Sequence, residues 1–338
     1  MKKHDFFHGF HIKKISVFTM LAALCVCLLT GCAQSGSIWV DDHRLHIVCT
    51  TFPQYDWVKN LIRGNEENIS VTLLMDKGGD LHNFQPSVSD IARVSECDLF
   101  IYVGGDSDGW VGDALKEAVN PDMHVINMME VVSERLVEEE HVEAVSGHGG
   151  HDHKEHGESE YDEHVWLSIR NAELIVEDIA TVLADMDSAN AGLYRKNGDR
   201  YIAALNALDI QYAEAVRKSS GNTLLFADRF PFRYFVEDYG LDYCAAFNGC
   251  SAETEASFGT VAFLVNKLDE LGLGAVIVID GSDDRLAQVV IENTKRGNQQ
   301  ILVLDTMQSV SQRDIRAGRS YLNVMEANLK VLRQALQY

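Results

Sequence analysis

Short runs of aliphatic and β-branched residues alternate with segments of helical periodicity along most of the chain, and this alternation constrains the fold more than any other feature. Strands separated by helices are typical of βαβ units and parallel sheets. Strands are predicted at 45–51, 69–75, 98–103 and 123–127 in the first half, and at 223–227, 242–246, 275–279 and 300–304 in the second. Apolar residues at three- and four-residue steps predict helices at 53–63, 88–94, 258–271, 284–294 and 320–337.

The segment between the two halves contains no strand pattern, and its apolar residues repeat at helical spacing. We therefore predict a linking helical segment at 169–220, with one main helix after a shorter one. The predicted fold is α/β, with two lobes that each hold a mainly parallel sheet flanked by helices and that are joined by this long connecting helix. A chain of this length normally forms two domains, here an N-terminal lobe at 45–168 and a C-terminal lobe at 221–338.

The N-terminal residues predict export from the cytoplasm. Four lysines precede an uncharged apolar run at 15–29, and a Leu-Thr-Gly-Cys sequence then ends at Cys32. These features are typical of a secretory signal peptide at 1–31, and the run is shorter than the ~20 residues of a comfortable membrane span. An uncleaved anchor or a buried helix is the alternative. Leu-x-Gly-Cys resembles the bacterial lipobox, which implies lipidation of Cys32, a tether at 32–44 and anchoring to the outer side of the cell membrane.

Charge argues against nucleic acid or an anionic lipid surface as the main partner. The whole chain has a net charge of −22, and residues 1–31 carry four Lys and one Asp, so the remaining chain has a net charge of about −25. Such a protein repels polyanions and suits a cationic ligand.

The cysteines predict no thiolate metal site, because no Cys-x-x-Cys pair occurs. Cys49 and Cys97 border apolar runs and are expected to be buried as small hydrophobic residues. Cys244 and Cys250 could form a disulfide in an oxidising compartment, but their spacing leaves this open.

Ten histidines lie after residue 31, and none lies after His164. A metal site between the lobes must therefore take its second-lobe ligands from carboxylates, with cysteine as the alternative. His82 lies in a Gly-rich loop between a predicted strand and a predicted helix, where open α/β sheets bind ligands. His164 lies where an acidic segment becomes apolar, and Asp162 could orient its ring from behind. For each histidine alone, a position without function is the alternative.

Residues 138–164 contain six His and ten acidic residues without apolar periodicity. We expect a mobile loop at 138–163, which collects metal ions because imidazoles and carboxylates suit zinc and copper. The histidines of this auxiliary site are His141, His148, His151, His153 and His156. The last three also resemble the HxHxDH pattern of metallo-β-lactamase-type hydrolases, but no strand pattern precedes them. A solvated loop without function is the remaining alternative.

Together these segments resemble the metal-binding lipoproteins of zinc and manganese ABC importers over essentially the whole chain after residue 31. The resemblance rests on Thr51-Phe52-Pro53, on Gly79-Asp80-Leu81-His82 with Pro86, on Asp108-Gly109-Trp110 and on Asp162-Glu163-His164-Val165-Trp166. It implies that His82 and His164 are metal ligands from the first lobe. The His-rich loop favours the zinc type.

The second lobe departs from the family pattern at the third ligand. Counted back from Tyr234, Arg229 lies at that position, and an arginine stays protonated and binds no cation. Asp228 is the natural substitute, with an ion pair to Arg229 or Arg233 as the alternative. Asp305 resembles the family residue that carries the fourth ligand, and Asp280 is a weaker candidate.

The segment 251–257 resembles an E-x-S element of the family that precedes a helix. Glu255 matches this element and is expected behind the ligands, whereas Glu253 is an additional acidic residue and a candidate ligand. Either carboxylate could instead cap the helix N-terminus.

The resemblance implies a non-enzymatic protein that captures Zn²⁺, with Mn²⁺ as the alternative, in an interlobe cleft and delivers it as a monomer to an ABC importer permease. The implied ligands are His82, His164, Asp228, Asp305 and Glu253. Binding should weaken below about pH 6, when imidazoles protonate. A surface adhesin or host-protein binder on the same scaffold is the main alternative. A zinc hydrolase, which needs an open coordination position and a general base, is a further one.

Overall fold

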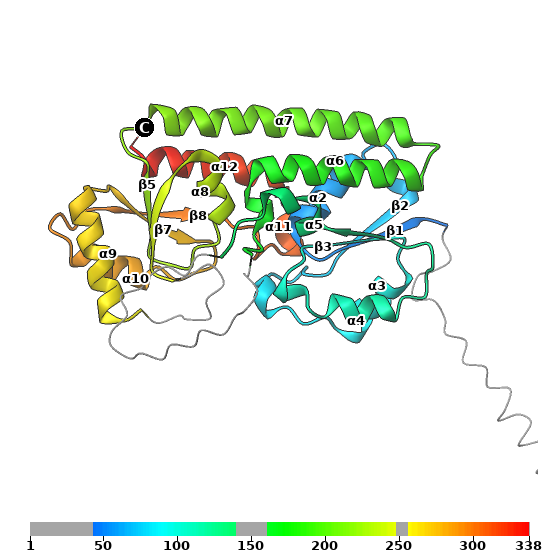
Figure 1. Cartoon of the computed structure of the whole chain (residues 1–338), viewed down its shortest axis with the longest axis horizontal. Coiled ribbons are helices and arrows are strands. Elements are labelled where there is room, and N and C mark those ends of the chain that lie inside the picture. The colour runs from blue at the N-terminus through cyan, green and yellow to red at the C-terminus, as the bar shows by residue number, and fades with distance from the viewer. Residues whose placement is uncertain (1–42, 140–160, 248–255, 338) are drawn as a thin grey trace, which may run out of the picture. The chain divides into compact units, whose positions relative to one another are not determined.

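The computed structural model describes residues 43–139, 161–247 and 256–337, and Asp42–Tyr338 form one compact unit. Two four-stranded parallel sheets lie within it (Figure 1). The first sheet contains β1 (Leu45–Cys49), β2 (Ile69–Leu73), β3 (Leu99–Tyr102) and β4 (His124–Asn127), and the second contains β5 (Thr223–Phe226), β6 (Asp242–Ala245), β7 (Ala275–Ile279) and β8 (Gln300–Leu304). All eight predicted strands form, and the predicted α/β class is confirmed.

The two sheets share one strand order, β2-β1-β3-β4 in the first and β6-β5-β7-β8 in the second. Each sheet has one topological switch point, where the strand order changes direction. It lies between β1 and β3 in the first sheet and between β5 and β7 in the second. Ligands of open α/β sheets bind outside the carboxyl ends of the strands at such a point. The loops that follow these strands are therefore the expected position of a site.

Eleven helices occur in the described part of the chain. They are α2 (Phe52–Leu61), α3 (Val88–Glu96), α4 (Val111–Lys116), α5 (Met128–Val131), α6 (Ile169–Met186), α7 (Ala191–Lys218), α8 (Arg233–Tyr239), α9 (Phe258–Leu271), α10 (Arg285–Glu292), α11 (Gln312–Arg316) and α12 (Tyr321–Ala335). Local sequence sets several of their ends. Thr51 and Gln54 form a capping box at the start of α2, and Gly240 and Gly272 end α8 and α9 in the left-handed conformation.

The predicted linking segment is a pair of helices, the 18-residue α6 followed by the 28-residue α7. The two helices lie side by side, and α7 runs past both sheets (Figure 1). It contacts α2, which belongs to the first half, and α12, which belongs to the second. The long connecting helix of the predicted fold is therefore confirmed.

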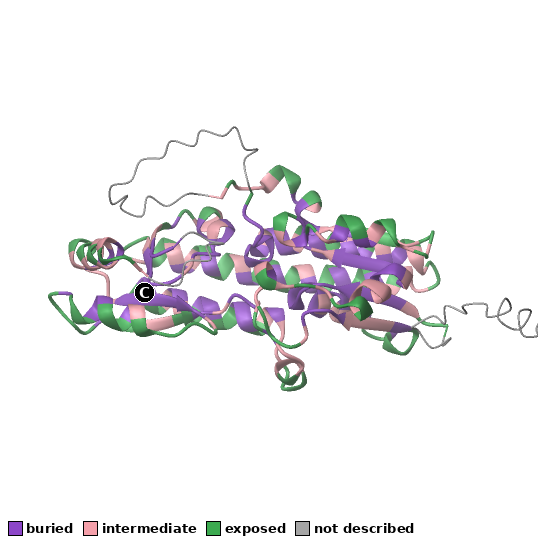
Figure 2. Cartoon of the chain, turned by 90° about the horizontal axis from the view of Figure 1, so that it is seen from below, coloured by how far each residue is buried: buried purple, intermediate pink, exposed green. Residues whose placement is uncertain are grey.

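The larger of two hydrophobic clusters joins the two halves, because its buried residues come from strands of both sheets, whereas the smaller cluster lies in the second half alone. Buried residues occur throughout the helices and strands of both halves (Figure 2). Trp57 of α2 packs edge-on against Tyr321 of α12, with 5.1 Å between the ring centroids. The Trp166 indole N–H donates to the Thr306 carbonyl at 2.9 Å, and the Tyr321 hydroxyl donates to the Trp166 carbonyl at 2.8 Å. These contacts oppose a large separation of the halves. The predicted lobe boundaries stay predictions.

Cys49 and Cys97 are buried, as expected from the sequence, and burial raises the pKa of both thiols, that of Cys97 to about 12. Both are therefore thiols rather than thiolate ligands near neutral pH. Cys250, the lipidation candidate Cys32 and the predicted signal peptide lie outside the described residues. Within 43–139, 161–247 and 256–337, no helix combines the length and the apolar character that crossing a membrane requires.

Candidate metal centre

The loop that carries His82 follows β2 and is attached to the second half of the molecule. Lys77 forms an antiparallel bridge with Ser311, and the Gln312 N–H donates to the Asp76 carbonyl at 2.9 Å. The His82 loop thus lies against the segment that follows β8, although more than two hundred residues separate them in the sequence.

His82 lies in a short 3₁₀ turn, Leu81–Asn83, that begins at Asp80. Asp80 Oδ1 accepts the backbone N–H of His82 at 3.1 Å, and Arg229 Nη1 lies 2.5 Å from Asp80 Oδ2. Burial raises the pKa of Asp80, but the hydrogen bond and the charge of Arg229 outweigh burial and hold that pKa below its ordinary value. Asp80 is therefore an ionised carboxylate next to His82.

The second histidine, His164, is fully buried and faces the first. The Nε2 atoms of His82 and His164 lie 3.3 Å apart. Two nitrogen ligands of one tetrahedral zinc, each about 2.05 Å from the metal, are separated by about 3.3 Å. The spacing of the two Nε2 atoms therefore matches a pair of ligands on a single zinc ion.

The other nitrogen of each imidazole is held from behind. His82 Nδ1 lies 2.7 Å from the Ser107 hydroxyl and 3.6 Å from Glu163 Oε2. His164 Nδ1 lies 3.1 Å from Asp162 Oδ1, which also accepts the His164 backbone N–H at 2.8 Å. A proton on each Nδ1 satisfies these acceptors and leaves the Nε2 lone pairs for a metal, the arrangement that is usual for metal-bound histidines.

Sequence reasoning singled out Asp162 but missed Ser107 and Glu163. Glu163 Oε1 accepts the backbone N–H of Ser107 at 2.8 Å, which fastens the turn after β3 to the segment of His164. Gly105 allows this approach, because its φ is +80° and a Cβ atom there would overlap the Glu163 carboxylate. The only sequence signals are the adjacency of Glu163 to His164 and the glycine pair at 104–105, which directly follows a predicted strand.

The two imidazoles differ in how readily they take up a proton. Burial and the neighbouring His164 lower the pKa of His82 to about 4. Burial alone would also lower the pKa of His164, but the charge and hydrogen bond of Asp162, with the charge of Glu163, raise it above its ordinary value. The pair therefore binds its first proton at His164, and His82 stays neutral near physiological pH.

The candidate ligands of the second half are engaged elsewhere. Asp228 follows β5 and is buried. Its Oδ1 accepts the Arg229 backbone N–H at 2.8 Å, and its Oδ2 accepts the Ile279 backbone N–H at 3.0 Å. Asp228 thus ties the end of β5 to the end of β7.

Asp305 follows β8 and pairs with Arg319, and its Oδ1 accepts the Met307 backbone N–H at 2.9 Å. Burial and the nearby Asp280 raise the pKa of Asp305, and the charge of Arg319 opposes this rise. Asp280 Oδ1 accepts both the backbone N–H and the hydroxyl of Thr306, at 2.6 and 2.7 Å.

The structure brings His82 and His164 together, but it does not complete a ligand set around them. In the part of the chain that the structure describes, no group of three or more His, Cys, Asp or Glu side chains is arranged to hold one metal ion. The predicted roles of Asp228 and Asp305 as ligands stay predictions. Glu253, Glu255 and the five histidines of the auxiliary site lie outside the described residues.

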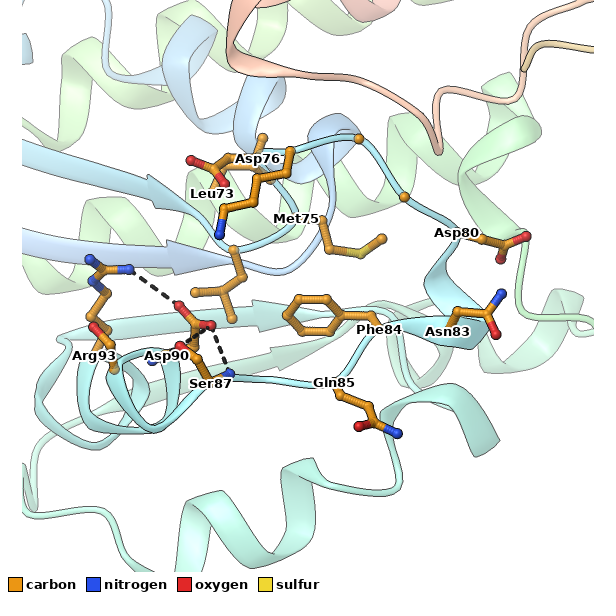
Figure 3. A pocket seen from close by; sticks show the side chains of 15 residues that line it. Leu73, Met75, Asp76, Asp80, Asn83, Phe84, Gln85, Ser87, Asp90 and Arg93 are labelled. Carbon is orange, nitrogen blue, oxygen red and sulfur yellow. Dashed lines mark hydrogen bonds and ion pairs between the residues drawn. The ribbon is translucent and has the colours of Figure 1, made fainter.

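A pocket of about 680 Å³ lies beside this site, between the His82 loop and the start of α3 (Figure 3). Met75, Asp76, Asp80 and Phe84 contribute to its lining. At its far end Arg93 pairs with Asp90. The pocket thus borders the His82 turn at Asp80.

Comparisons with known proteins identify the family of this chain. The family described as "Zinc-uptake complex component A periplasmic" matches residues 47–335. The chain belongs to this family. Its membership confirms the resemblance to metal-binding proteins of zinc importers, and the family is a solute-binding one rather than a family of enzymes.

Two curated relatives of this family member cover nearly the whole chain. It is 30% identical to the zinc-binding lipoprotein AdcA of Streptococcus pneumoniae over 328 residues, which are 96% of this chain and 61% of AdcA. The chain thus spans about three fifths of the AdcA length. It is 28% identical to the high-affinity zinc uptake system protein ZnuA of Bacillus subtilis, with 96% of this chain and 98% of that protein covered.

The fold agrees with a solved structure of the same kind. The Zn(II)-bound ZnuA-like domain of Streptococcus pneumoniae AdcA superposes with a TM-score of 0.67 at 26% identity. The superposition covers 87% of this chain and all of that domain. The predicted two-lobe α/β fold is therefore confirmed.

Proposed function

We propose that the protein captures Zn²⁺ outside the cytoplasm and delivers it to the permease of an ABC importer. The facing pair of Nε2 atoms, 3.3 Å apart and each held from behind through Nδ1, carries this proposal. Membership of a zinc-uptake family and the zinc bound to the related pneumococcal domain support it.

Zn²⁺ is favoured over Mn²⁺ by the chemistry of this pair. Imidazole nitrogens suit zinc, whereas manganese prefers carboxylate, carbonyl and water oxygens. The carboxylates of Asp228 and Asp305 that could supply such oxygens already bind backbone N–H groups. In this proposal His82 and His164 are the principal ligands and Asp162 fixes the His164 ring.

The His-rich loop is proposed to deliver zinc to this pair. Its described ends come together at an antiparallel bridge between Glu138 and Tyr161, and the Asp162 N–H donates to the Val137 carbonyl at 3.0 Å. The loop therefore begins and ends next to Asp162 and His164, close to the proposed ligands.

Release is proposed to require the importer. The shared core and the contacts of Trp57, Trp166 and Tyr321 oppose free separation of the two halves. Docking on the permease would therefore have to shift the His82 loop against the segment after β8. The lipid anchor at Cys32 and a monomeric state are parts of the same proposal, and they would keep the protein next to its transporter.

The proposal is tested by equilibrium binding of Zn²⁺ and Mn²⁺ to the protein lacking residues 1–31, in the wild type and in His82→Ala and His164→Ala variants. Loss of groups behind zinc ligands costs about 10- to 100-fold in affinity, so loss of a ligand should weaken zinc binding more than about 100-fold. His124→Ala, on the exposed face of β4, is the matched control and should bind zinc like the wild type. Unchanged zinc affinity in both site variants would refute the proposal.

A further inference from the structure

We propose that Asp80 supplies a third protein ligand to the metal, in the centre where Arg229 stands at the position of the family's third ligand. This inference rests on the proposed function, because it concerns the same site. Neither the sequence motif nor the resemblance assigns Asp80 to the metal.

The position of Asp80 relative to His82 carries the inference. Asp80 Oδ1 lies 4.0 Å from His82 Nε2, the nitrogen that faces His164. Two ligand atoms of a tetrahedral zinc lie about 3.3 Å apart, so the distance between Oδ1 and His82 Nε2 needs to shorten by less than about 1 Å. Oδ1 also accepts the His82 backbone N–H, so the carboxylate and the imidazole belong to one turn and move together.

Asp80 lies on the side of the His82 ring that faces His164, because its Oδ1 approaches Nε2, the nitrogen that faces the second imidazole. Glu163 acts from the opposite side, because its nearest contact with His82 is at Nδ1.

Asp80 is distinguished from the other carboxylates by its position. Both oxygens of Asp228 accept backbone N–H groups. Asp305 and Asp80 share one pattern, in which Oδ1 accepts a backbone N–H and Oδ2 pairs with an arginine. Only Asp80 also belongs to the turn of His82, with its Oδ1 4.0 Å from His82 Nε2.

Arg229 then has a positioning role. Its Nη1 lies 2.5 Å from Asp80 Oδ2, and this contact fixes the orientation of the carboxylate. Its positive charge also offsets the negative charge of Asp80, so we expect Arg229 to weaken the attraction of the site for zinc.

The test compares Asp80→Asn with Arg229→Gln in zinc titrations. Asparagine caps a helical turn about as well as aspartate, so Asp80→Asn removes the ligand charge and preserves the turn. Arg229→Gln breaks the same ion pair but keeps the carboxylate. Asp80→Asn should weaken zinc binding more than about 100-fold, whereas Arg229→Gln should bind zinc more tightly than the wild type. Asp76→Asn removes a charge from the same loop and should bind zinc like the wild type.

The outcomes separate this inference from the proposed function. Wild-type affinity in Asp80→Asn, together with loss in His82→Ala, overturns the inference and leaves the proposed function standing. Equal losses in Asp80→Asn and Arg229→Gln also overturn it, because the ion pair would then be only structural. Wild-type affinity in both His82→Ala and His164→Ala overturns the proposed function itself.

A crystal structure of the zinc-loaded wild type tests the inference without any variant. An Asp80 oxygen about 2.0–2.2 Å from the metal supports it. A water molecule or another carboxylate at that position, with Asp80 still bound only to Arg229, overturns it.

Discussion

The two sheets have the same strand order, but the polar side chains at the carboxyl ends of their strands are arranged in different ways. In the first half, the Nε2 atoms of His82 and His164 face each other. In the second half, Asp228 and Asp305 bind backbone N–H groups. The first half therefore directs two imidazole nitrogens at one point, whereas the second half uses its carboxylates to hold its own loops.

This difference shows that a centre between two similar sheets can be built mainly from one of them. The second half contributes by holding the His82 loop, through Ser311, Gln312 and the ion pair of Arg229 with Asp80. When a carboxylate moves away from a buried backbone N–H group, the N–H loses its acceptor and the fold loses about 1–3 kcal/mol of stability. A carboxylate that joins two strand ends in this way is therefore less suited to bind a metal ion.

The largest expected effect on zinc affinity is that of replacing His82 or His164. The second largest is that of lowering the pH, which acts on the imidazoles of the first half. Zinc binding needs neutral imidazoles, and Asp162 and Glu163 hold the pKa of His164 above its ordinary value, so zinc must displace a proton once the pH falls below that pKa. Below that pKa the affinity should fall by up to about tenfold per pH unit. The dependence should steepen only near pH 4, where His82 also protonates.

Zinc titrations between pH 7.5 and 5.5 measure this effect. Zinc affinity should begin to fall at a higher pH than the value of about 6 that ordinary imidazoles imply. Asp162→Asn removes the carboxylate that raises the pKa of His164, so its onset should lie at a lower pH. A constant affinity across this range, or release of two protons throughout it, would contradict the description of the pair.

A smaller effect is expected when the second half is given an imidazole. Arg229→His places a histidine where the family has its third ligand and removes a positive charge from the site. Zinc affinity should rise by at least about tenfold, which corresponds to 1.4 kcal/mol. Arg229→Gln separates the effect of the charge from that of the added ligand. Equal affinities in the two variants would show that the imidazole at 229 does not reach the metal.

The smallest effect on zinc is expected from Asp228→Asn. Asp228 accepts two backbone N–H groups, those of Arg229 and Ile279. Asparagine has only one acceptor oxygen, so its NH₂ group would face the other N–H and leave that donor without an acceptor. The free energy of unfolding should therefore fall by about 1–3 kcal/mol. Zinc affinity should stay within a few-fold of that of the wild type. Denaturant unfolding and zinc titration of the same preparation measure both quantities. If zinc binding is lost while stability is retained, Asp228 is a ligand, as the sequence predicted.

The main elements of the fold could be predicted from the sequence because each has a periodic pattern. The eight strands and the five predicted helices form with small differences at their ends. The short helices α4, α5, α8 and α11 were missed, since four to seven residues give too few turns for a periodic signal.

The sequence by itself determined the alternating α/β pattern. It also determined that any histidine ligand comes from the first part of the chain, because no histidine follows His164. Only the tertiary structure decided which nitrogens face each other and which carboxylates are engaged. Asp228 binds the N–H of Ile279 across a gap of 51 residues, and Asp80 meets Arg229 across 149. Sequence spacing carries no information on such pairs, because they depend on how the ends of the strands come together in the folded chain.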